Sequence, residues 1–176
     1  LDPKFAFAYK NLGVALHEQK KLPEAIDAFH KAIELDPKYV LAHLGLGDAL
    51  RDKGDVNGAI AAYQKAIELE PKEASVYERL GFVLTRKRDF DGAIAAYRTA
   101  VELNPKSAPA HSNLGIILCD RKQNYDGAAA AFRKAIALQP EWVEAHFNLG
   151  FALRFKGDTK EAICAFREAI RLQPSY

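Results

Sequence analysis

Small, apolar and aromatic residues recur along the chain in a fixed order. The stretch GAIAAYQKAIELEP, from Gly58 to Pro71, returns with few changes at 24–37, 92–105, 127–140 and 161–174. The prolines that close the copies are 34 or 35 residues apart, at Pro3, Pro37, Pro71, Pro105, Pro140 and Pro174. A repeat of this length is one supersecondary unit that must stack on its neighbours to bury its apolar face. The pattern predicts a single linear array over residues 1–176, with one continuous core and no domain boundary.

The repeats are counted here from Ala6 as position 1. Five units then cover 6–39, 40–73, 74–107, 108–142 and 143–176, and residues 1–5 match the tail of a preceding repeat. Each unit holds two helical patterns, about 6–19 and 22–35 in the first. The first pattern, helix A, has apolar or small residues at positions 4, 7, 8 and 11, the spacing of one helix face. The second, helix B, has alanine at positions 20 and 27 and a ring at position 24. Small residues opposite a glycine allow close approach, which predicts an antiparallel helix pair.

Turn residues support these boundaries. Gly54 and Gly157 stand where helix A ends, which suits a left-handed C-terminal cap. Asp158 and Glu161 have the spacing of a capping box. The extra residue of the fourth unit is expected in its A–B turn, where an insertion costs least. Candidate N-caps of helix B are Asp55, Asp89, Asn124 and Asp158.

These residues together resemble the tetratricopeptide repeat (TPR). Leu-Gly at positions 7 and 8, tyrosine or histidine at 4, alanine at 20 and 27, a ring at 24 and proline at 32 recur in all five units. The resemblance implies an all-α fold, a right-handed superhelical α-solenoid whose concave face, lined by the A helices, binds peptides or extended protein segments. The Asn-Leu-Gly triplets at Asn11, Asn113 and Asn148 are similar to those of long superhelical arrays such as that of O-linked N-acetylglucosamine transferase. There the asparagines form a ladder that grips a peptide backbone.

Positions 2, 6, 9 and 13 lie opposite the core face of helix A and should line this groove. An asparagine amide can pair with both polar groups of a passing peptide bond, and an arginine can hold a carboxylate by two parallel bonds. Apolar residues beside them would accept the side chains of the ligand. The alternative is that these are ordinary exposed asparagines beside half-buried rings. The predicted peptide-binding residues are Asn11, Arg79, Phe82, Asn113, Ile116, Asn148, Phe151 and Phe155.

A receptor for acidic chaperone tails is disfavoured. The carboxylate clamp that the TPR family uses for such tails is matched at Lys10 and Arg79. Val14, Gly45 and Ser75 stand where it needs asparagine or lysine.

The histidines and cysteines do not form a chemical site in this pattern. His43, His111 and His146 share position 4 of different repeats, so they cannot converge on one metal and are expected to pack. His17 and His30 have no carboxylate or thiol partner at ligand spacing. Cys119 is expected near the groove edge and Cys164 on the outside of helix B, neither beside an activating histidine. We therefore expect no enzyme, no metal and no cofactor.

Charge and composition limit the partners. A formal net charge of +2 does not favour nucleic acid, and no run of 18 apolar residues predicts a membrane span. Two cysteines are too few for a disulfide framework and are compatible with the cytoplasm without fixing a location.

The predicted function is a protein-interaction scaffold that binds extended peptides. One alternative is the regulatory or substrate-presenting arm of a larger enzyme, such as a glycosyltransferase or kinase. Another is a self-assembling solenoid without a peptide ligand. Ile163 and Ile170 remain on an apolar flank of the last helix B, and LDPKF at 1–5 repeats the end of a unit. Both features suggest a piece of a longer array, and we expect end-to-end association of chains.

Overall fold

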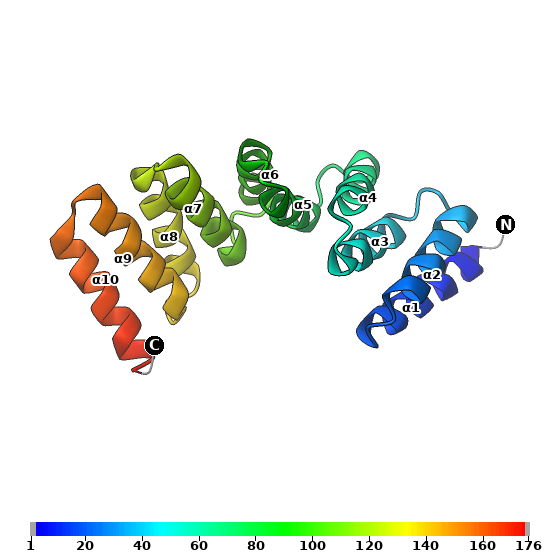
Figure 1. The fold of residues 1–176 in the computed structure, drawn as a ribbon, viewed down its shortest axis with the longest axis horizontal. Helices are drawn as coiled ribbons and strands as arrows, with labels where there is room; N and C mark the ends of the chain where they lie inside the picture. The colour runs from blue at the N-terminus through cyan, green and yellow to red at the C-terminus, as the bar shows by residue number, and fades with distance from the viewer. Residues whose placement is uncertain (1–2, 175–176) are drawn as a thin grey trace. The chain divides into compact units, whose positions relative to one another are not determined.

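The computed structural model describes residues 3–174, and within them it contains helices and no strand (Figure 1). The predicted all-α fold is therefore confirmed. The odd-numbered helices are the A helices and the even-numbered helices the B helices. The helices of the described residues are α1 (Pro3–Glu18), α2 (Leu22–Leu35), α3 (Val40–Lys53), α4 (Val56–Leu69), α5 (Ala74–Lys87), α6 (Phe90–Leu103), α7 (Ala108–Lys122), α8 (Tyr125–Leu138), α9 (Val143–Lys156) and α10 (Thr159–Leu172).

The chain divides into two compact units, unit 1 over Leu1–Asp89 and unit 2 over Phe90–Tyr176. In unit 1, α1 packs on α2, α3 packs on α4, and each of α2 and α4 also packs on the A helix that follows it. In unit 2, α7 pairs with α8 and α9 with α10, while α6 and α8 pack on the following A helices. The two helices of the third repeat, α5 and α6, belong to different units. A single continuous solenoid over residues 1–176 stays a prediction.

The first helix begins earlier than the pattern predicted. Residues 3–5, expected as part of a preceding tail, continue α1, and residues 1–2 of that tail lie outside the described residues. At the end of the first repeat the corresponding residues form a turn, in which Asp36 Oδ1 accepts from Lys38 N at 3.0 Å. The equivalent aspartate, Asp2, is not among the described residues.

Rings that lie directly against glycines hold the helix pairs together. Phe29, Tyr63 and Phe132 are almost fully buried in their B helices. A Cβ atom on Gly13 would lie 2.7 Å from Phe29 Cε1, and one on Gly115 would lie 2.8 Å from Phe132 Cε1. Both distances are too short for any side chain, so only glycine lets the ring occupy this space. The predicted close approach of helices A and B is confirmed.

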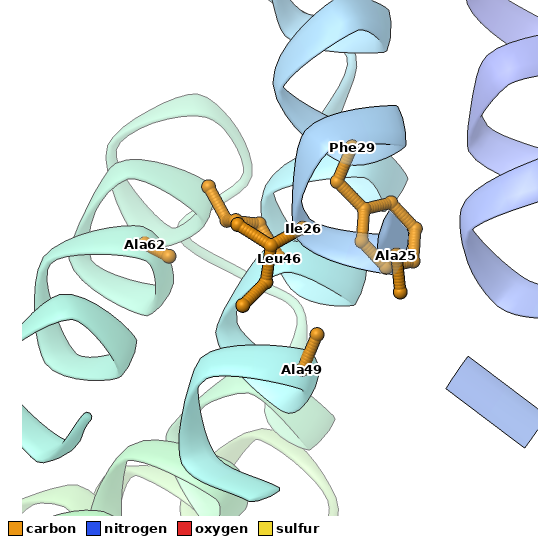
Figure 2. Close-up of a cluster of buried hydrophobic side chains, with 6 residues drawn as sticks. All are labelled: Ala25, Ile26, Phe29, Leu46, Ala49 and Ala62. Carbon is orange, nitrogen blue, oxygen red and sulfur yellow. The ribbon is translucent and has the colours of Figure 1, made fainter. Parts of the chain in front are cut away.

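Successive repeats of unit 1 share one apolar core. Figure 2 shows a cluster from three helices, with Ala25, Ile26 and Phe29 on α2, Leu46 and Ala49 on α3, and Ala62 on α4. Leu46 occupies position 7 of helix A and packs against the preceding repeat. Leu12 occupies the same position in α1 but is 48% exposed, whereas Leu149 in α9 is 9% exposed. The prediction that Leu12 belongs to the core face was wrong, because no described helix precedes α1 to cover it.

The helix ends agree with most of the predicted caps. Gly54 and Gly157 have φ angles of 91° and 100°, which is the left-handed conformation expected there. The side chain of Asp55 accepts from Gly58 N at 2.9 Å, and that of Asn124 accepts from Gly127 N at 3.0 Å. The capping box at Asp158 was a wrong prediction. Its side chain accepts no backbone bond from α10 and instead pairs with Lys156 Nζ at 2.9 Å.

None of the helices described in residues 3–174 combines the length and apolar character needed to span a bilayer.

Candidate peptide-binding face

The predicted binding residues lie on one face of the A helices, here called the groove face and defined by positions 2, 6, 9 and 13. In unit 1 this face carries Asn11 on α1 and Arg79 and Phe82 on α5. Asn11 is exposed and accepts a hydrogen bond from Lys10 Nζ at 2.6 Å. Phe82 is also exposed, and the guanidinium carbon of Arg51 lies 6.0 Å from its ring centroid.

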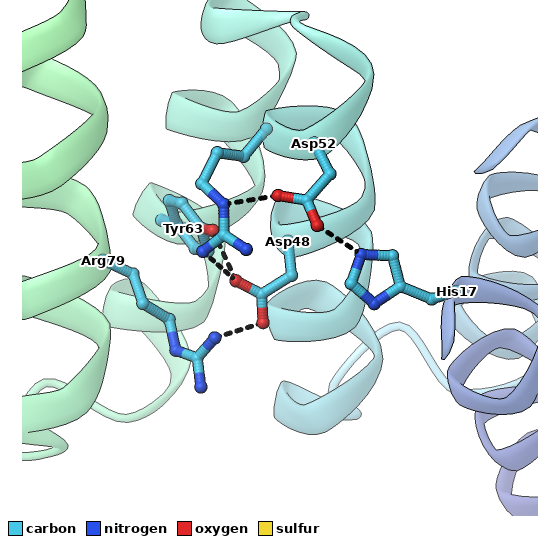
Figure 3. A network of polar contacts seen from close by, with 6 residues as sticks. His17, Asp48, Asp52, Tyr63 and Arg79 are labelled. Carbon is cyan, nitrogen blue, oxygen red and sulfur yellow. Dashed lines mark hydrogen bonds and ion pairs between the residues drawn. The ribbon is translucent and has the colours of Figure 1, made fainter. Parts of the chain in front are cut away.

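A polar network occupies the groove face of unit 1 (Figure 3). The carboxylate of Asp48 accepts from the Tyr63 hydroxyl at 2.8 Å and from Arg51 Nη1 at 3.0 Å. Arg79 donates to the other oxygen of Asp48. Arg79 was predicted to hold a ligand carboxylate, but its guanidinium is already paired inside the protein.

A second carboxylate extends the network to α1. Asp52 accepts from Arg51 Nε at 2.9 Å and from His17 Nε2 at 2.8 Å. Burial alone would raise the pKa of Asp52, but the bonds from Arg51 and His17 outweigh it and hold that pKa below its usual value. Burial, together with the negative charge of Asp48, raises the pKa of the Tyr63 hydroxyl. The network thus joins four helices, α1, α3, α4 and α5.

Sequence reasoning missed this network. His17 was expected to have no carboxylate or thiol at metal-ligand spacing, and its single hydrogen bond to Asp52 was not foreseen. The available signal was in the repeat register. His17 and Arg51 both occupy position 12, and Asp48 and Asp52 occupy positions 9 and 13 of the second repeat. Position 12 of one A helix therefore lies next to position 13 of the following A helix, where His17 meets Asp52.

In unit 2 the groove face is aromatic. Phe151 and Phe155, one helical turn apart on α9, have ring centroids 4.9 Å apart. Phe147 lies 6.1 Å from Phe151, and Tyr125 at the start of α8 stacks on Phe155 at 5.6 Å. Arg154 lies over Phe155, with its guanidinium carbon 5.6 Å from the ring centroid. Phe147 and Tyr125 were not predicted, because neither occupies a groove position of helix A.

Asn148 lies beside these rings, and Asn113 occupies the same repeat position on the preceding A helix. Asn113 on α7 and Asn148 on α9 are half-buried, and neither amide makes a hydrogen bond within the described residues. Ile116 is also half-buried and lines a small pocket of about 130 Å³ together with Asn148 and Phe151. The structure thus brings Ile116, Asn148 and Phe151 together, and none of these three side chains is fully covered by a neighbouring helix.

A second pocket lies next to the first. It has a volume of about 320 Å³, and it shares Cys119, Asp120 and Phe151 with the smaller pocket. Its other lining residues are Arg121, Gln123, Tyr125 and Phe155. Cys119 is buried beside these groove-face residues, and burial, followed by the charge of Asp120, raises the pKa of its thiol. A buried thiol of raised pKa is a poor nucleophile.

The position-4 histidines have a structural role, as predicted, and they also make a hydrogen bond that was not foreseen. Nε2 of His43 donates to the Pro37 carbonyl at 2.9 Å, and Nε2 of His146 donates to the Pro140 carbonyl at 2.8 Å. His111 and Tyr77 make the equivalent bonds to Pro105 and Pro71. Each bond ties helix A to the proline that closes the preceding helix B. Among residues 3–174, no group of three or more acidic, histidine or cysteine residues could hold a metal ion.

Comparisons with known proteins agree with this architecture. Tetratricopeptide-repeat family models match residues 6–39, 79–136 and 120–176, and a TPR repeat model matches 47–87. The chain belongs to the tetratricopeptide repeat family. No curated protein matches it.

Solved structures of TPR proteins are similar over nearly the whole chain. A crystal structure of the MamA protein has 29% identity and a TM-score of 0.89, covering 97% of this chain and 93% of that one. A second MamA crystal structure has 30% identity and a TM-score of 0.87, with 92% and 94% covered. YrrB, described as a TPR protein with an unusual peptide-binding site, has 26% identity and a TM-score of 0.83, with 97% and 88% covered. The repeats and these relatives support a protein-interaction scaffold.

Proposed function

We propose that this chain binds an extended peptide segment on the groove face of unit 2. The observation that supports this most directly is the pair of half-buried amides, Asn113 and Asn148, that have no partner within the described residues. A half-buried amide without a partner can exchange its water for the backbone of a ligand at little cost. The neighbouring rings of Phe151 and Phe155 would take up apolar side chains of that ligand. The peptide-binding site ascribed to YrrB supports the same choice of ligand.

The proposal assigns different roles to the two halves of the predicted site. Asn113, Ile116, Asn148, Phe151 and Phe155 would contact the peptide. Asn11, Arg79 and Phe82 belong to unit 1, where Arg79 is paired with Asp48, so we do not place the peptide on that guanidinium. The chain itself is proposed to be non-catalytic, since its groove thiol is buried and its position-4 histidines are bonded to backbone carbonyls.

The asparagines can be tested once a peptide array has provided a ligand. The double variant Asn113→Ala, Asn148→Ala should weaken that peptide by about 1 kcal/mol per lost hydrogen bond, measured by calorimetry. A matched control is Asn57→Ala, because Asn57 is exposed at the start of α4 and outside the groove face. Unchanged affinity in the double variant would remove the asparagines from the binding site.

A second proposal concerns the ends of the array. Ile163 and Ile170 on α10 are 45% and 56% exposed, whereas Ile26, Ile60 and Ile94, which share the repeat position of Ile163, are each 8% exposed. In those repeats the following A helix covers the isoleucine. On α1, Ala8 and Ala15 are exposed, although their equivalents Ala42 and Ala49 are fully buried against the preceding repeat.

The charges at the two ends match as well. Arg133 on α8 pairs with Glu161 on α10 at 2.6 Å, which joins position 25 of one repeat to position 19 of the next. Arg167 and Glu24 occupy these same two positions at opposite ends of the chain. A second copy could therefore continue the array, with α1 of one copy covering α10 of another. The repeat following in a longer parent protein would cover the same surface.

Association is measured by light scattering over a concentration series. The double variant Ile163→Lys, Ile170→Lys should lower the apparent mass, because two charges would be buried in the contact. Phe155→Lys, on the groove face, should leave association unchanged. A wild-type chain that stays monomeric at the highest concentration would exclude the proposed contact.

A third possibility retained from the sequence is the arm of a larger enzyme such as a glycosyltransferase or kinase. The sequence of the parent gene on both sides of residues 1–176 tests it directly. A catalytic domain in the same reading frame would support the enzyme arm.

A further inference from the structure

Asp120 is a groove-face carboxylate without a partner. It lies near the end of α7, lines both pockets of unit 2, and makes no ion pair or hydrogen bond with any described residue. Asp52 occupies the same position 13 in the second repeat, yet it accepts bonds from both Arg51 and His17. The position-13 aspartate is therefore paired with basic side chains in unit 1 and has no such pair among the described residues of unit 2.

The walls beside Asp120 are aromatic. Tyr125, Phe151 and Phe155 line the larger pocket, whose volume of about 320 Å³ is at the lower end of the range for ligand sites. Lysine and arginine are the side chains that fit such a place best. Their aliphatic stems pack on apolar surface while their charged ends stay beside a carboxylate.

Two arginines near the pocket carry charge of the opposite sign, but both are engaged with rings. The guanidinium carbon of Arg121 lies 5.1 Å from the ring centroid of Phe90, although Arg121 also lines the larger pocket. Arg154 lies over Phe151 and Phe155 at 5.9 and 5.6 Å. Neither arginine pairs with Asp120. These contacts also show that the aromatic surface of unit 2 accepts guanidinium groups from within the chain.

We propose that the Asp120 pocket binds a lysine or arginine side chain of the peptide held on the groove face of unit 2. This inference rests on the proposed function and adds the chemical class of one ligand residue. The basic side chain would lie against Phe151 and Phe155 and pair with Asp120. The ligand backbone would run past the asparagines. An acidic ligand residue would instead be repelled by the negative charge of Asp120, which lines both pockets.

The test uses NMR titration of the whole chain, labelled with ¹⁵N, with a set of matched peptides. The probe is the host sequence GSGLXLGSG with blocked ends, in which X is lysine, arginine, norleucine or glutamate. Lysine and arginine peptides should shift signals of α7 and α9 around Asp120 and bind about fivefold more tightly than the norleucine peptide. The glutamate peptide should bind most weakly. The lysine preference should fall as salt is added, because the site is partly open to solvent.

Two variants separate the pocket from general electrostatics. Asp120→Asn should reduce the ratio of lysine to norleucine affinity to about one, since only the charge is removed. Glu102→Gln removes the same charge from an exposed position on α6 that lies outside the groove face and lines neither pocket, and it should keep the preference.

The outcomes distinguish this inference from the function on which it rests. If lysine and norleucine peptides bind equally and move the same signals, the peptide site stands and the basic pocket is wrong. A preference that survives Asp120→Asn also overturns the pocket. If no peptide moves any signal of α7 or α9, and the array-selected peptide is insensitive to the asparagine variant, both proposals fall.

Discussion

At the scale of single residues, the glycine at position 8 of helix A determines how closely two helices pack. Gly115 lies against the buried ring of Phe132, where a Cβ atom would lie 2.8 Å from Cε1 and 2.9 Å from Cζ. The ring is enclosed on its other sides and cannot move away freely. The small residue is therefore required by packing rather than by backbone conformation.

Gly115→Ala should accordingly destabilise the protein. Overpacking costs about 1–3 kcal/mol, and the roughly 1 kcal/mol that alanine gains over glycine within a helix offsets part of it, which leaves a net loss of up to about 2 kcal/mol. Urea unfolding followed by circular dichroism measures the difference. Lys134→Ala on the exposed side of α8 is the control and should change stability little. A more stable Gly115→Ala protein would show that the ring can be displaced at low cost.

Predictions for single residues succeeded where the environment of the side chain recurs in every repeat. They failed where that environment depends on which side chains of a neighbouring helix lie opposite. The buried rings, the glycines and the structural histidines follow from recurrence at fixed positions, so the sequence predicts them. The pairing of Arg79 with Asp48 depends on which charges meet across two helices, and a single-helix pattern does not contain that information. Likewise Tyr125 joins the aromatic cluster from a B helix, outside the positions considered for the groove.

At the scale of the helices, the A–B turns use left-handed residues that are not always glycine. The two glycine caps are Gly54 and Gly157, whereas Lys20, Arg88 and Gln123 adopt φ angles of 61°, 66° and 50° at the corresponding turns. A side chain in this conformation costs about 1–2 kcal/mol relative to the right-handed form, and glycine does not bear this cost. Replacing a non-glycine residue in one of these turns by glycine should therefore raise the free energy of unfolding.

Gln123→Gly should stabilise the chain by about 1 kcal/mol, because this strained residue caps α7 and its side chain makes no hydrogen bond or ion pair with the described residues. The reciprocal change, Gly157→Gln, should destabilise it by a similar amount. Thermal unfolding of both variants against the parent gives the comparison. Equal shifts of the same sign would contradict the argument from backbone conformation.

Helix bounds were predicted closely for the internal helices. α2 spans Leu22–Leu35, which is the range the pattern indicated. The extra residue of the fourth repeat behaves differently from the expectation. α7 has 15 residues where α5 and α9 have 14, so the insertion lengthens the helix before the left-handed Gln123. At the end of α7 the backbone N–H groups of Gln123 and Asn124 both donate to the Leu118 carbonyl, so the inserted residue is accommodated at the helix end, which loop-length reasoning alone does not include.

At the scale of the whole molecule, the two units hold their groove faces in different electrostatic states. In unit 1 the carboxylates of Asp48 and Asp52 pair with Arg51 on their own helix and with His17 and Arg79 from the neighbouring A helices. These pairs contribute to the stability of unit 1 only while the carboxylates are ionised. In unit 2 the equivalent carboxylate, Asp120, is free of such pairs among the described residues.

The stability of unit 1 should depend on Asp52 in a pH-dependent way. Because the pKa of Asp52 is lowered in the folded protein, its contribution is present above the unfolded pKa of about 3.9 and is lost as the pH falls through the folded pKa. Asp52→Asn should therefore be less stable than the parent near neutral pH, and the difference should vanish in acid.

Urea midpoints across a pH series measure this difference. Asp27→Asn is the matched control, because Asp27 is exposed on α2 and has no described partner, so its curve should run parallel to the parent. A constant gap between Asp52→Asn and the parent at every pH would mean that Asp52 acts through its shape and not its charge.

The bond from each position-4 side chain to a proline carbonyl also decides where the chain can be lengthened. Each of these bonds joins a side chain to the carbonyl six residues before it, at His43, Tyr77, His111 and His146. The length of the B-to-A connection is therefore fixed by a side-chain bond as well as by the backbone. The A-to-B turn has no equivalent bond from a position-4 side chain. An epitope tag or a fluorescent label inserted beside Gly54 or Gly157 would extend into solvent. The same insertion between Pro37 and His43 would break the hydrogen bond that joins two successive repeats.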